Sequence, residues 1–302
     1  MGKTLRETIK EIIRKHLKNK KGNVFGQCLT AVGWVGGTLP KLYEKDGMIE
    51  LSMADVAGGG IVTGSALMNK KPIYVIRYQG FNWYNAPMIV NYAAKSKEIW
   101  NTPCPVFVRG IGMEGGIGPV AGSSHHSLYY RMPGLKIVSP MSPKEYVKIY
   151  NSFMKDDEVY YVSEHRGSFN NKIELKNYTK GKKDFVIIAI SITRFEALKA
   201  KKILEKKGLK IGIINVLWIK PFKISKSSIK CLINSRFGGI VIDDDYVDGI
   251  SNSLANKLNH LTNKKIFTMG LSNKSAGFHR KVDNLPPNYS QIAKRIISII
   301  EN

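Results

Sequence analysis

The chain has 302 residues, of which 43% are hydrophobic and 23% are charged; this ordinary globular balance excludes wholesale disorder and predicts about two domains. Lysine and arginine number 47 against 23 acidic residues, which gives a net charge of +24. The lysines are spread along the chain, and no arginine-rich arm or nucleic-acid-binding signature accompanies them. We therefore interpret the charge as a solvated basic face and predict no nucleic-acid partner. An acidic partner chain or an anionic substrate would also suit it.

The cysteines and the apolar runs bear on the compartment. Cys28, Cys104 and Cys231 are odd in number and far apart, so they indicate neither a disulfide framework nor a zinc site. The first residues lack an apolar signal region, and no apolar run reaches the length of a membrane span. We expect a cytoplasmic protein with reduced thiols and no membrane contact.

The first half of the chain alternates between strand-like and helix-like segments. Apolar residues at helical spacing predict an amphipathic helix at residues 4–20. Beyond it, the predicted helices are 62–67, 88–100 and 144–154, and the predicted strands are 72–77, 105–109, 135–139 and 159–162. Strands that alternate with helices are typical of a parallel α/β sheet.

A polar stretch rich in lysine and asparagine, residues 166–183, suits a linker. A second alternating unit follows, with strands at 185–190, 210–217, 239–243 and 266–269 and helices at 194–207, 225–234, 247–261 and 289–300. We predict an α/β protein with two domains, residues 1–170 and 183–302, each a mainly parallel sheet flanked by helices.

Residues 110–115 match the dinucleotide fingerprint G-x-G-x-x-G and follow a predicted strand. The next residues, 116–119, read Gly-Ile-Gly-Pro and cannot start the helix that the fingerprint requires. We interpret the segment as a glycine-rich loop whose backbone can approach a ligand closely, and we do not predict a nicotinamide cofactor.

Three features converge in the first domain. Asp55 stands at a predicted strand-to-helix junction, and the helix that follows is rich in small residues. Tyr78, Phe81 and Tyr84 repeat at intervals of three residues. The glycine-rich loop ends in the pair His125–His126, which a Pro-Gly-Leu-Lys run at residues 133–136 follows.

With these features the sequence resembles the transketolase-like thiamine diphosphate enzymes, in particular the beta subunit of the decarboxylase component of 2-oxo acid dehydrogenases such as pyruvate dehydrogenase. The resemblance covers nearly the whole chain, and its further carrying segments are residues 88–95, 106–110, 133–140, 217–221 and 241–243. It implies a pyrimidine-binding fold for the first domain and a transketolase C-terminal-type fold for the second.

The resemblance also implies a role for Asp55. In relatives a glutamate at this position binds the far ring nitrogen of the cofactor's aminopyrimidine and promotes the imino tautomer that activates the thiazolium carbon. Aspartate is one methylene shorter, about 1.5 Å of reach, so either the backbone lies closer or activation is weaker. A structural alternative for Asp55 is a helix N-cap.

The remaining site residues are assigned in the same way. Met53, Tyr78, Phe81 and Tyr84 match the surroundings of the aminopyrimidine, and ordinary core packing is the alternative for Tyr78 and Tyr84.

A family histidine that exchanges protons with substrate oxygens corresponds to His125 or His126. The segment that follows is about three residues shorter than in relatives, so the alignment does not choose between the two. A loop histidine without a role is the alternative.

The family's G-D-G…N motif, which holds the diphosphate and its magnesium, is absent from this sequence. In relatives with split chains this motif belongs to the alpha subunit. The resemblance therefore implies an alpha-type partner, thiamine diphosphate, Mg²⁺ held mainly by the partner, and a pair of copies of this chain in an α₂β₂ assembly.

Three functions remain open at this point. One is 2-oxo acid decarboxylation with acyl transfer to a lipoyl acyltransferase core. The second is transketolase-type ketol or acyl transfer onto sugars. The third is a noncatalytic regulatory subunit on the same fold.

Overall fold

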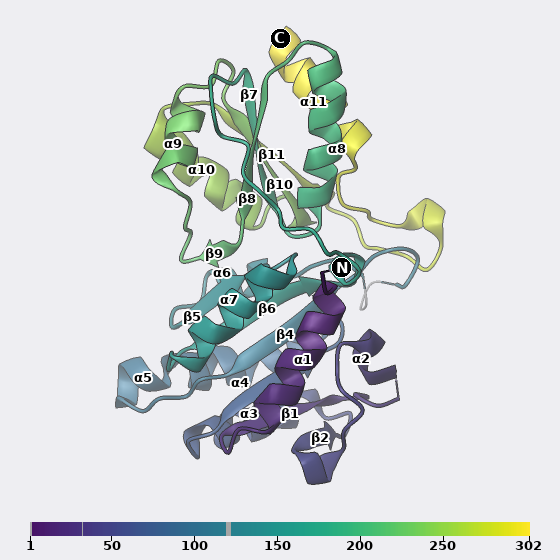
Figure 1. Cartoon of the computed structure of the whole chain (residues 1–302), viewed down its shortest axis with the longest axis vertical. Helices are drawn as coiled ribbons and strands as arrows, with labels where there is room; N and C mark the ends of the chain where they lie inside the picture. The colour runs from purple at the N-terminus through teal and green to yellow at the C-terminus, as the bar shows by residue number, and fades with distance from the viewer. Residues whose placement is uncertain (1, 32, 119–121) are drawn as a thin grey trace. The chain divides into compact units, whose positions relative to one another are not determined.

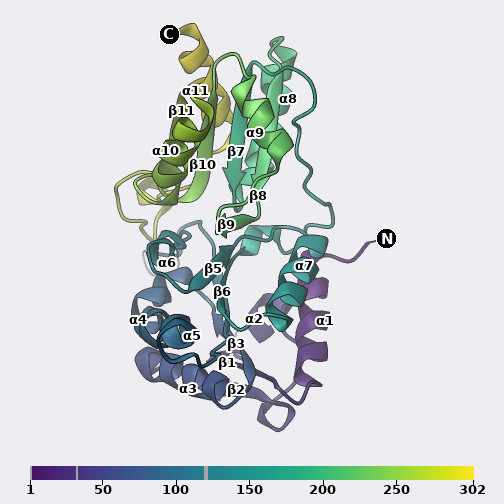
Figure 2. The same cartoon turned by 90° about the vertical axis from the view of Figure 1, so that its left-hand side faces the viewer.

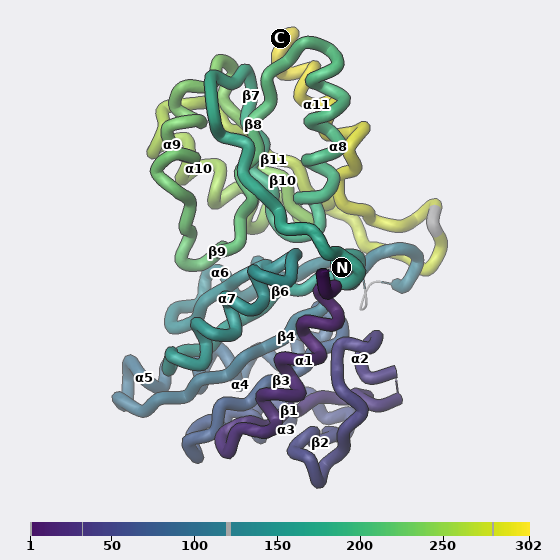
Figure 3. Tube along the Cα trace, in the orientation of Figure 1, coloured from purple at the N-terminus to yellow at the C-terminus, as the bar shows by residue number. Residues whose placement is uncertain are grey.

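The computed structural model describes residues 2–31, 33–118 and 122–302. The chain divides into two compact units: residues 1–113 with 120–174, and residues 114–119 with 175–302. Figure 3 traces the chain from its N-terminal helix in the first unit to its C-terminal helix in the second. The second unit thus includes residues 114–119, a part of the glycine-rich segment that the sequence assigns to the first domain.

A parallel sheet with the strand order β2-β1-β3-β4-β6-β5 forms the centre of the first unit. Its strands are β1 (Gly22–Gln27), β2 (Met48–Leu51), β3 (Lys71–Ile76), β4 (Phe107–Gly112), β5 (Leu135–Val138) and β6 (Val159–His165). Its helices are α1 (Leu5–Leu17), α3 (Asp55–Leu67), α4 (Asn82–Met88), α5 (Ala94–Trp100), α6 (Ser127–Tyr130) and α7 (Pro143–Met154). In Figure 2, α1 and α7 lie on one side of this sheet and α3, α4 and α5 on the other.

Local sequence explains where these elements begin and how they pack. Thr4 and Glu7 form a reciprocal capping box at the start of α1. Pro143 stands in the first turn of α7, where its missing N–H leaves no helical bond unmade. Strands β4 and β6 are buried along their whole length, as expected for central strands covered by helices on both faces.

Two short segments interrupt the regular pattern. A π-helical segment (Ile89–Ala93) joins α4 to α5, so the helix predicted at 88–100 is continuous in space but starts earlier and contains this bulge. The element α2 (Gly33–Gly37) is a left-handed turn in which all five residues have positive φ.

The predicted glycine-rich loop at 110–115 is wrong in its first part, because Gly110 and Gly112 belong to β4. At Gly110 a Cβ would lie 2.2 Å from the Tyr161 hydroxyl, so the strand itself requires glycine there.

The second unit contains another parallel sheet, with the order β11-β10-β7-β8. Its strands are β7 (Phe185–Ile190), β8 (Ile211–Val216), β10 (Gly239–Tyr246) and β11 (Ile266–Leu271), and β9 (Trp218–Lys220) is a short further strand. Helices α8 (Thr193–Lys206) and α11 (Tyr289–Glu301) cover one face, and α9 (Lys226–Ile233) and α10 (Ile250–Thr262) lie on the other side of the strands (Figure 1). The predicted α/β class and the mainly parallel sheets are confirmed.

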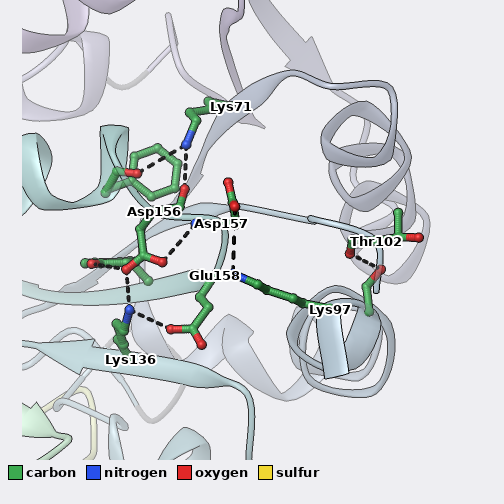
Figure 4. Close-up of polar contacts among 10 residues, drawn as sticks. Lys71, Lys97, Thr102, Lys136, Asp156, Asp157 and Glu158 are labelled. Atoms are coloured by element: carbon green, nitrogen blue, oxygen red, sulfur yellow. Dashed lines mark hydrogen bonds and ion pairs between the residues drawn. The ribbon is translucent and has the colours of Figure 1, made fainter. Parts of the chain in front are cut away.

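An ion network lies at the amino ends of β3, β5 and β6 in the first unit (Figure 4). Lys136 Nζ forms ion pairs with both Asp156 and Glu158, and Lys71 Nζ donates to the backbone oxygen of Asp156. Burial opposes the charge of Lys136, but the hydrogen bonds to Asp156 and Glu158 outweigh it and raise the pKa of Lys136. Lys136, Asp156 and Glu158 are therefore paired with one another at this edge of the sheet, and Lys71 is held by backbone oxygens.

No helix among the described residues combines the length and the apolar character that crossing a bilayer requires.

Candidate active site

The polar residues of the first unit gather where its parallel strands end. Gln27 is the last residue of β1, Asp55 opens α3 shortly after β2, and Tyr78 follows β3. His126 follows the loop after β4, and Ser163 lies near the end of β6. In parallel α/β sheets, ligands bind outside the carboxyl ends of the strands, so this edge is the expected place for a site.

Two amide side chains hold the Asp55 carboxylate. Gln27 Nε2 donates to Asp55 Oδ1 over 2.9 Å, and Asn85 Nδ2 donates to the same oxygen over 3.1 Å. Oδ2 has no hydrogen bond to the described residues. Ala54, not Asp55, is the N-cap of α3, so the helix-cap alternative is wrong and Asp55 is the first helical residue. A carboxylate there is favoured by the helix dipole.

A second layer of hydrogen bonds fixes Asn85. Its Nδ2 also donates to the backbone oxygen of Phe81 over 2.9 Å, and its Oδ1 accepts from the hydroxyl of Tyr74. Burial, helped by the charge of Asp55, raises the pKa of Tyr74, so this phenol keeps its proton and acts as a donor. The amide of Asn85 is therefore oriented with its N–H groups toward Asp55.

A small pocket opens beside Asp55. Its lining residues are Gln27, Asp55, Val75, Ile76, Arg77, Phe81 and Asn85. About 10 Å³ inside it admits the centre of a water-sized sphere, which is room for about one water molecule. A flat ring is larger than this space and can enter only after lining side chains move aside.

The predicted aromatic residues separate in space. Phe81 lines the Asp55 pocket, and Tyr78 packs edge-on against the Phe81 ring with centroids 5.8 Å apart. Tyr84 on α4 is 57% exposed and does not line the pocket, nor does Met53, which is 69% exposed. Residues 79–81 form a 3₁₀ turn before α4. Tyr84 comes six residues after Tyr78, and at helical spacing this separation directs the two side chains to different sides.

The buried Gln79 ties the histidine segment to the sheet. Its Oε1 accepts from the backbone N–H of His125 over 2.7 Å. Its Nε2 donates to Ser163 Oγ over 2.9 Å and to the backbone oxygen of Gly110 over 3.2 Å. Gln79 thus joins the ends of β4 and β6 to the loop that carries both histidines.

His126 is fully buried, whereas His125 is partly exposed. His126 Nδ1 lies 3.0 Å from Ser163 Oγ. Ser163 Oγ accepts from Gln79, and it can either donate to His126 Nδ1 or accept from it, according to the tautomer of the ring. A neutral His126 that accepts at Nδ1 carries its ring proton on Nε2.

A buried ion pair lies in the same sheet. Arg109 on β4 binds Glu164 on β6 through two hydrogen bonds, Nε to Oε1 at 2.7 Å and Nη2 to Oε2 at 2.8 Å. Tyr146 donates to Glu164 Oε1 over 2.7 Å, and Arg109 Nη2 also donates to Thr38 Oγ1 over 3.0 Å. Burial alone would lower the pKa of Arg109, but the charge of Glu164 and its hydrogen bonds raise it.

Comparison with known protein families decides the assignment. The family described as "Transketolase, pyrimidine binding domain" matches residues 3–172, more than half of the chain. The chain belongs to the transketolase family. The family "Transketolase, C-terminal domain" matches residues 176–273, in the second unit.

Curated relatives of this transketolase-family chain carry dehydrogenase names. The beta subunit of the mitochondrial pyruvate dehydrogenase E1 component of Rattus norvegicus is 25% identical over 203 residues, which cover 61% of this chain and 56% of the relative. The beta subunit of 2-oxoisovalerate dehydrogenase of Bacillus subtilis is 24% identical over 226 residues, which cover 66% of each chain. The chain thus spans less than two thirds of the length of either relative.

Solved structures share the fold. A structure titled "Split gene transketolase, inactive beta4 tetramer" aligns with a TM-score of 0.73 and 14% identity, and covers 100% of this chain and 99% of its own. A transketolase from Campylobacter jejuni aligns with a TM-score of 0.70 and 17% identity over 98% of this chain and 46% of its own.

Sequence reasoning on this transketolase-family chain missed four polar residues of the site, namely Gln27, Gln79, Asn85 and Ser163. None of them forms a recognisable motif with Asp55 or the histidines. Gln27 and Ser163 lie at or near the carboxyl ends of strands, and this position is the signal that could have found them.

Proposed function

We propose that this chain is the beta-type subunit of a heteromeric, thiamine diphosphate-dependent enzyme that cleaves a carbon–carbon bond next to a carbonyl and transfers the acyl fragment. The family assignment and the dehydrogenase names of its relatives support this proposal. Bound thiamine diphosphate would supply the nucleophilic carbon and the electron sink that side chains lack.

The Asp55 carboxylate is the observation that carries the proposal. Gln27 and Asn85 occupy one carboxylate oxygen, and the other is available to share a proton with a ring nitrogen in the pocket that Phe81 lines. A carboxylate acceptor beside an aromatic wall suits the aminopyrimidine in its polar groups. In this role Asp55 holds a proton at the ring, Phe81 contacts the ring face, and Gln27 and Asn85 fix the carboxylate.

The histidines suit proton exchange with the substrate. His126 is buried and its Nδ1 faces Ser163, so Nε2 is the atom that we assign as the donor. His125 is held by its backbone to Gln79 and is the more exposed of the pair. We assign His126 as the proton donor to substrate oxygens and His125 as a neighbour that contacts the substrate.

Helix α3 supports the need for a partner. Apart from Asp55 it carries no charged residue, and four residues along it and just beyond it, Val56, Ile61, Leu67 and Met68, are 48–79% exposed. A helix that is apolar all round belongs in an interior. We propose that this face of α3 takes a subunit that completes the cofactor site and holds the diphosphate and Mg²⁺.

The match to a structure titled as an inactive beta4 tetramer is consistent with this proposal, because a tetramer of beta chains with the same fold is described there as inactive. We expect the purified chain alone to lack turnover.

The central test compares Asp55→Asn with Asp157→Asn in the assembly captured with a tagged chain from its native lysate. Asp157 is a half-exposed aspartate of the same unit, paired with Lys97 at 3.7 Å, and serves as the control. We expect Asp55→Asn to lose at least about 100-fold in turnover while Asp157→Asn keeps it. Full turnover of Asp55→Asn would refute the catalytic role and favour the noncatalytic subunit.

The partner surface has its own test. Ile61→Glu places a charge on the exposed face of α3, and Ile173→Glu places one on a 72% exposed isoleucine elsewhere in the unit. We expect Ile61→Glu alone to release the partner in size-exclusion chromatography with light scattering. Equal assembly by both variants would show that this face of α3 is not the contact.

Transketolase-type transfer onto sugars is the second candidate. Two solved structures titled as transketolases align with 98–100% of this chain and favour it. A lipoyl acyltransferase in the captured assembly would select the dehydrogenase reaction. Turnover with a sugar acceptor and without that core would select the second candidate.

A further inference from the structure

A chain of hydrogen bonds connects Tyr74, in the middle of β3, to the Asp55 carboxylate. The Tyr74 hydroxyl donates to Asn85 Oδ1, and Asn85 Nδ2 donates to Asp55 Oδ1 over 3.1 Å. Tyr74 is 2% exposed and Asn85 is 1% exposed, so water does not compete for these bonds. The three residues come from β3, α4 and α3, and each of them orients the next one.

Helix α3 is shaped to admit this chain of hydrogen bonds. A Cβ on Gly58 would lie 2.9 Å from the Tyr74 hydroxyl, and a Cβ on Gly59 would lie 3.1 Å from the backbone oxygen of Asn85. Both glycines follow Asp55 within the first two turns of the same helix. The helix that carries the acid therefore has no side chain at the two places where Tyr74 and Asn85 approach it.

The two amides that donate to Asp55 are held in place by the surrounding structure. Asn85 Nδ2 also donates to the backbone oxygen of Phe81 over 2.9 Å, and its Oδ1 accepts from Tyr74. Gln27 is the last residue of β1 and is 8% exposed, and its Nε2 donates to Asp55 Oδ1 over 2.9 Å. Moving the Asn85 amide would break its bonds to Tyr74 and Phe81, so the position of this donor is set before any ligand arrives.

This geometry matches the length of an aspartate. One more methylene would advance the carboxylate by about 1.5 Å, whereas hydrogen bonds of this kind hold only over about 2.7–3.2 Å. The pocket beside Asp55 has room for about one water molecule, so a longer acid would also fill the space that a ligand needs. A glutamate would lose the bond to Asn85 or push the Asn85 amide away from Tyr74.

We propose that Asn85, oriented by Tyr74, is a positioning residue that matches this site to an aspartate. It holds the Asp55 carboxylate at one depth in the pocket, and it makes a longer acid ineffective as long as its own side chain is present. Asn85 and Tyr74 act only through Asp55 in this role. The inference rests on the proposed function for the role of Asp55 in turnover, and it adds that the acid and its amide partner work as a matched pair.

The first test needs neither a partner nor a ligand, and it compares two variants of Asp55 in the ¹⁵N-labelled full chain. Asp55→Asn keeps the length of the side chain and loses its charge, whereas Asp55→Glu does the reverse. We expect NMR to show that the Asn85 side-chain amide exchanges its hydrogens at least about 10-fold faster in Asp55→Glu than in Asp55→Asn. Equal exchange in the two variants would show that the donor follows the longer acid, and would overturn the proposal.

The second test exchanges the acid and its partner in the captured assembly at saturating thiamine diphosphate. We expect Asp55→Glu to lower kcat by about 10- to 100-fold, because the carboxylate is displaced. The double variant Asp55→Glu/Asn85→Ala should recover at least about 10-fold over Asp55→Glu, because removal of the amide makes room for the extra methylene. No recovery in the double variant, or full kcat in Asp55→Glu, overturns the proposal.

Tyr74→Phe tests the step before Asn85. It removes one hydroxyl at nearly constant volume, and we expect it to lower kcat about 3- to 10-fold with little change in KM. Added to Asn85→Ala it should cause no further loss of kcat, because its effect passes through the amide.

Tyr160→Phe is the matched control for Tyr74→Phe. Tyr160 is a buried tyrosine of β6 whose hydroxyl donates to Asp156 over 2.7 Å at the opposite edge of the sheet. We expect Tyr160→Phe to keep kcat within about 2-fold even where it lowers thermal stability as much as Tyr74→Phe does. An equal loss of kcat in the two variants would show general destabilisation and refute the role of Tyr74.

The matched pair and the proposed function can fail separately. Full turnover of Asp55→Asn would refute the catalytic role of the acid, whereas the exchange of the Asn85 amide in the chain alone would still decide the match in length. Loss of turnover in Asp55→Asn together with full turnover in Asp55→Glu would keep the catalytic role and overturn the match.

Discussion

The two edges of the first unit's sheet differ in whether their charged side chains have partners. At the amino edge, Lys136 pairs with Asp156 and Glu158, and Lys71 is bound by a backbone oxygen (Figure 4). At the carboxyl edge, Arg77 and Arg166 have no anionic partner among the described residues. Satisfied charges stabilise a fold, whereas charges held ready without partners suit a ligand. The difference separates the part of the sheet that maintains the structure from the part that we propose binds a ligand.

The largest loss of stability is expected from substitution of Arg109, the arginine that is paired with Glu164. Arg109→Met leaves Glu164 buried without its cation, and this should lower the free energy of unfolding by about 3–5 kcal/mol. Urea denaturation followed by tryptophan fluorescence measures it. The double variant Arg109→Met/Glu164→Leu should recover much of the loss, because it removes both charges. A small loss in the single variant would show that the pair matters little.

Low pH should destabilise the fold through His16, a histidine of α1 next to the amino edge of the sheet. Burial lowers the pKa of His16 to about 4, and Nδ1 lies 2.9 Å from the Tyr150 hydroxyl. Below about pH 6.5 His16 becomes protonated in the unfolded chain but stays neutral in the folded chain. The free energy of unfolding is therefore highest above this pH and decreases as the pH falls toward 4.

We expect this loss to reach at most about 3 kcal/mol. His16→Gln should show a correspondingly shallower decline when denaturation is repeated between pH 7 and pH 4. Parallel curves for the two proteins would contradict the assignment.

A smaller effect is expected from the ion network. Lys136→Met leaves Asp156 and Glu158 without their cation, but the group is partly exposed, so the loss should be about 1–2 kcal/mol. Lys97→Met breaks an exposed 3.7 Å pair with Asp157 and should change stability by less than about 0.5 kcal/mol. Thermal unfolding of both variants checks the order, and the reverse order would contradict the comparison.

A stability change as small as that of Lys97→Met should come from the unpaired arginines. Arg77→Met and Arg166→Met remove charges that no described acid neutralises, so stability should change by less than about 0.5 kcal/mol in either direction. Denaturation of both variants beside Arg131→Met, which removes an exposed arginine of the same unit, measures this. A loss as large as that of Arg109→Met would mean that these arginines have a structural role.

The sequence predicted the regular elements well where periodicity was strong. The buried runs that became β3, β4, β6 and β7 and the amphipathic helices α1, α7 and α8 lie where apolar spacing indicated them. The strand β1 was missed, and β2 was implied only by the junction at Asp55 without bounds, because glycine, asparagine, glutamine and glutamate interrupt their apolar pattern. The periodicity marked only the last turns of α3, because glycines lower helix propensity in its first turns and packing against neighbours compensates.

The candidate site was predicted only in part. The resemblance named Asp55 and Phe81, and the structure places both at one pocket. Gln27 and Asn85 reach the Asp55 carboxylate from positions 28 and 30 residues away in the chain, and no local pattern encodes such a meeting. The approach of Arg77 and Arg166 to one tyrosine ring was likewise invisible, since the two arginines meet only because β3 and β6 end at the same edge.

Helix α3 contains four glycines in thirteen residues, Gly58, Gly59, Gly60 and Gly64. At Gly58 a Cβ would lie 2.9 Å from the Tyr74 hydroxyl, and at Gly59 it would lie 3.1 Å from the side chain of Met88, so a larger residue at either position would force its neighbours to shift. Each glycine costs about 1 kcal/mol of helix propensity relative to alanine, about 4 kcal/mol in all. The order of this helix therefore depends on its neighbours. Since Asp55 is its first residue, covering the exposed face of α3 would also make the acid more rigid, and assembly would then act as the step that switches the site on.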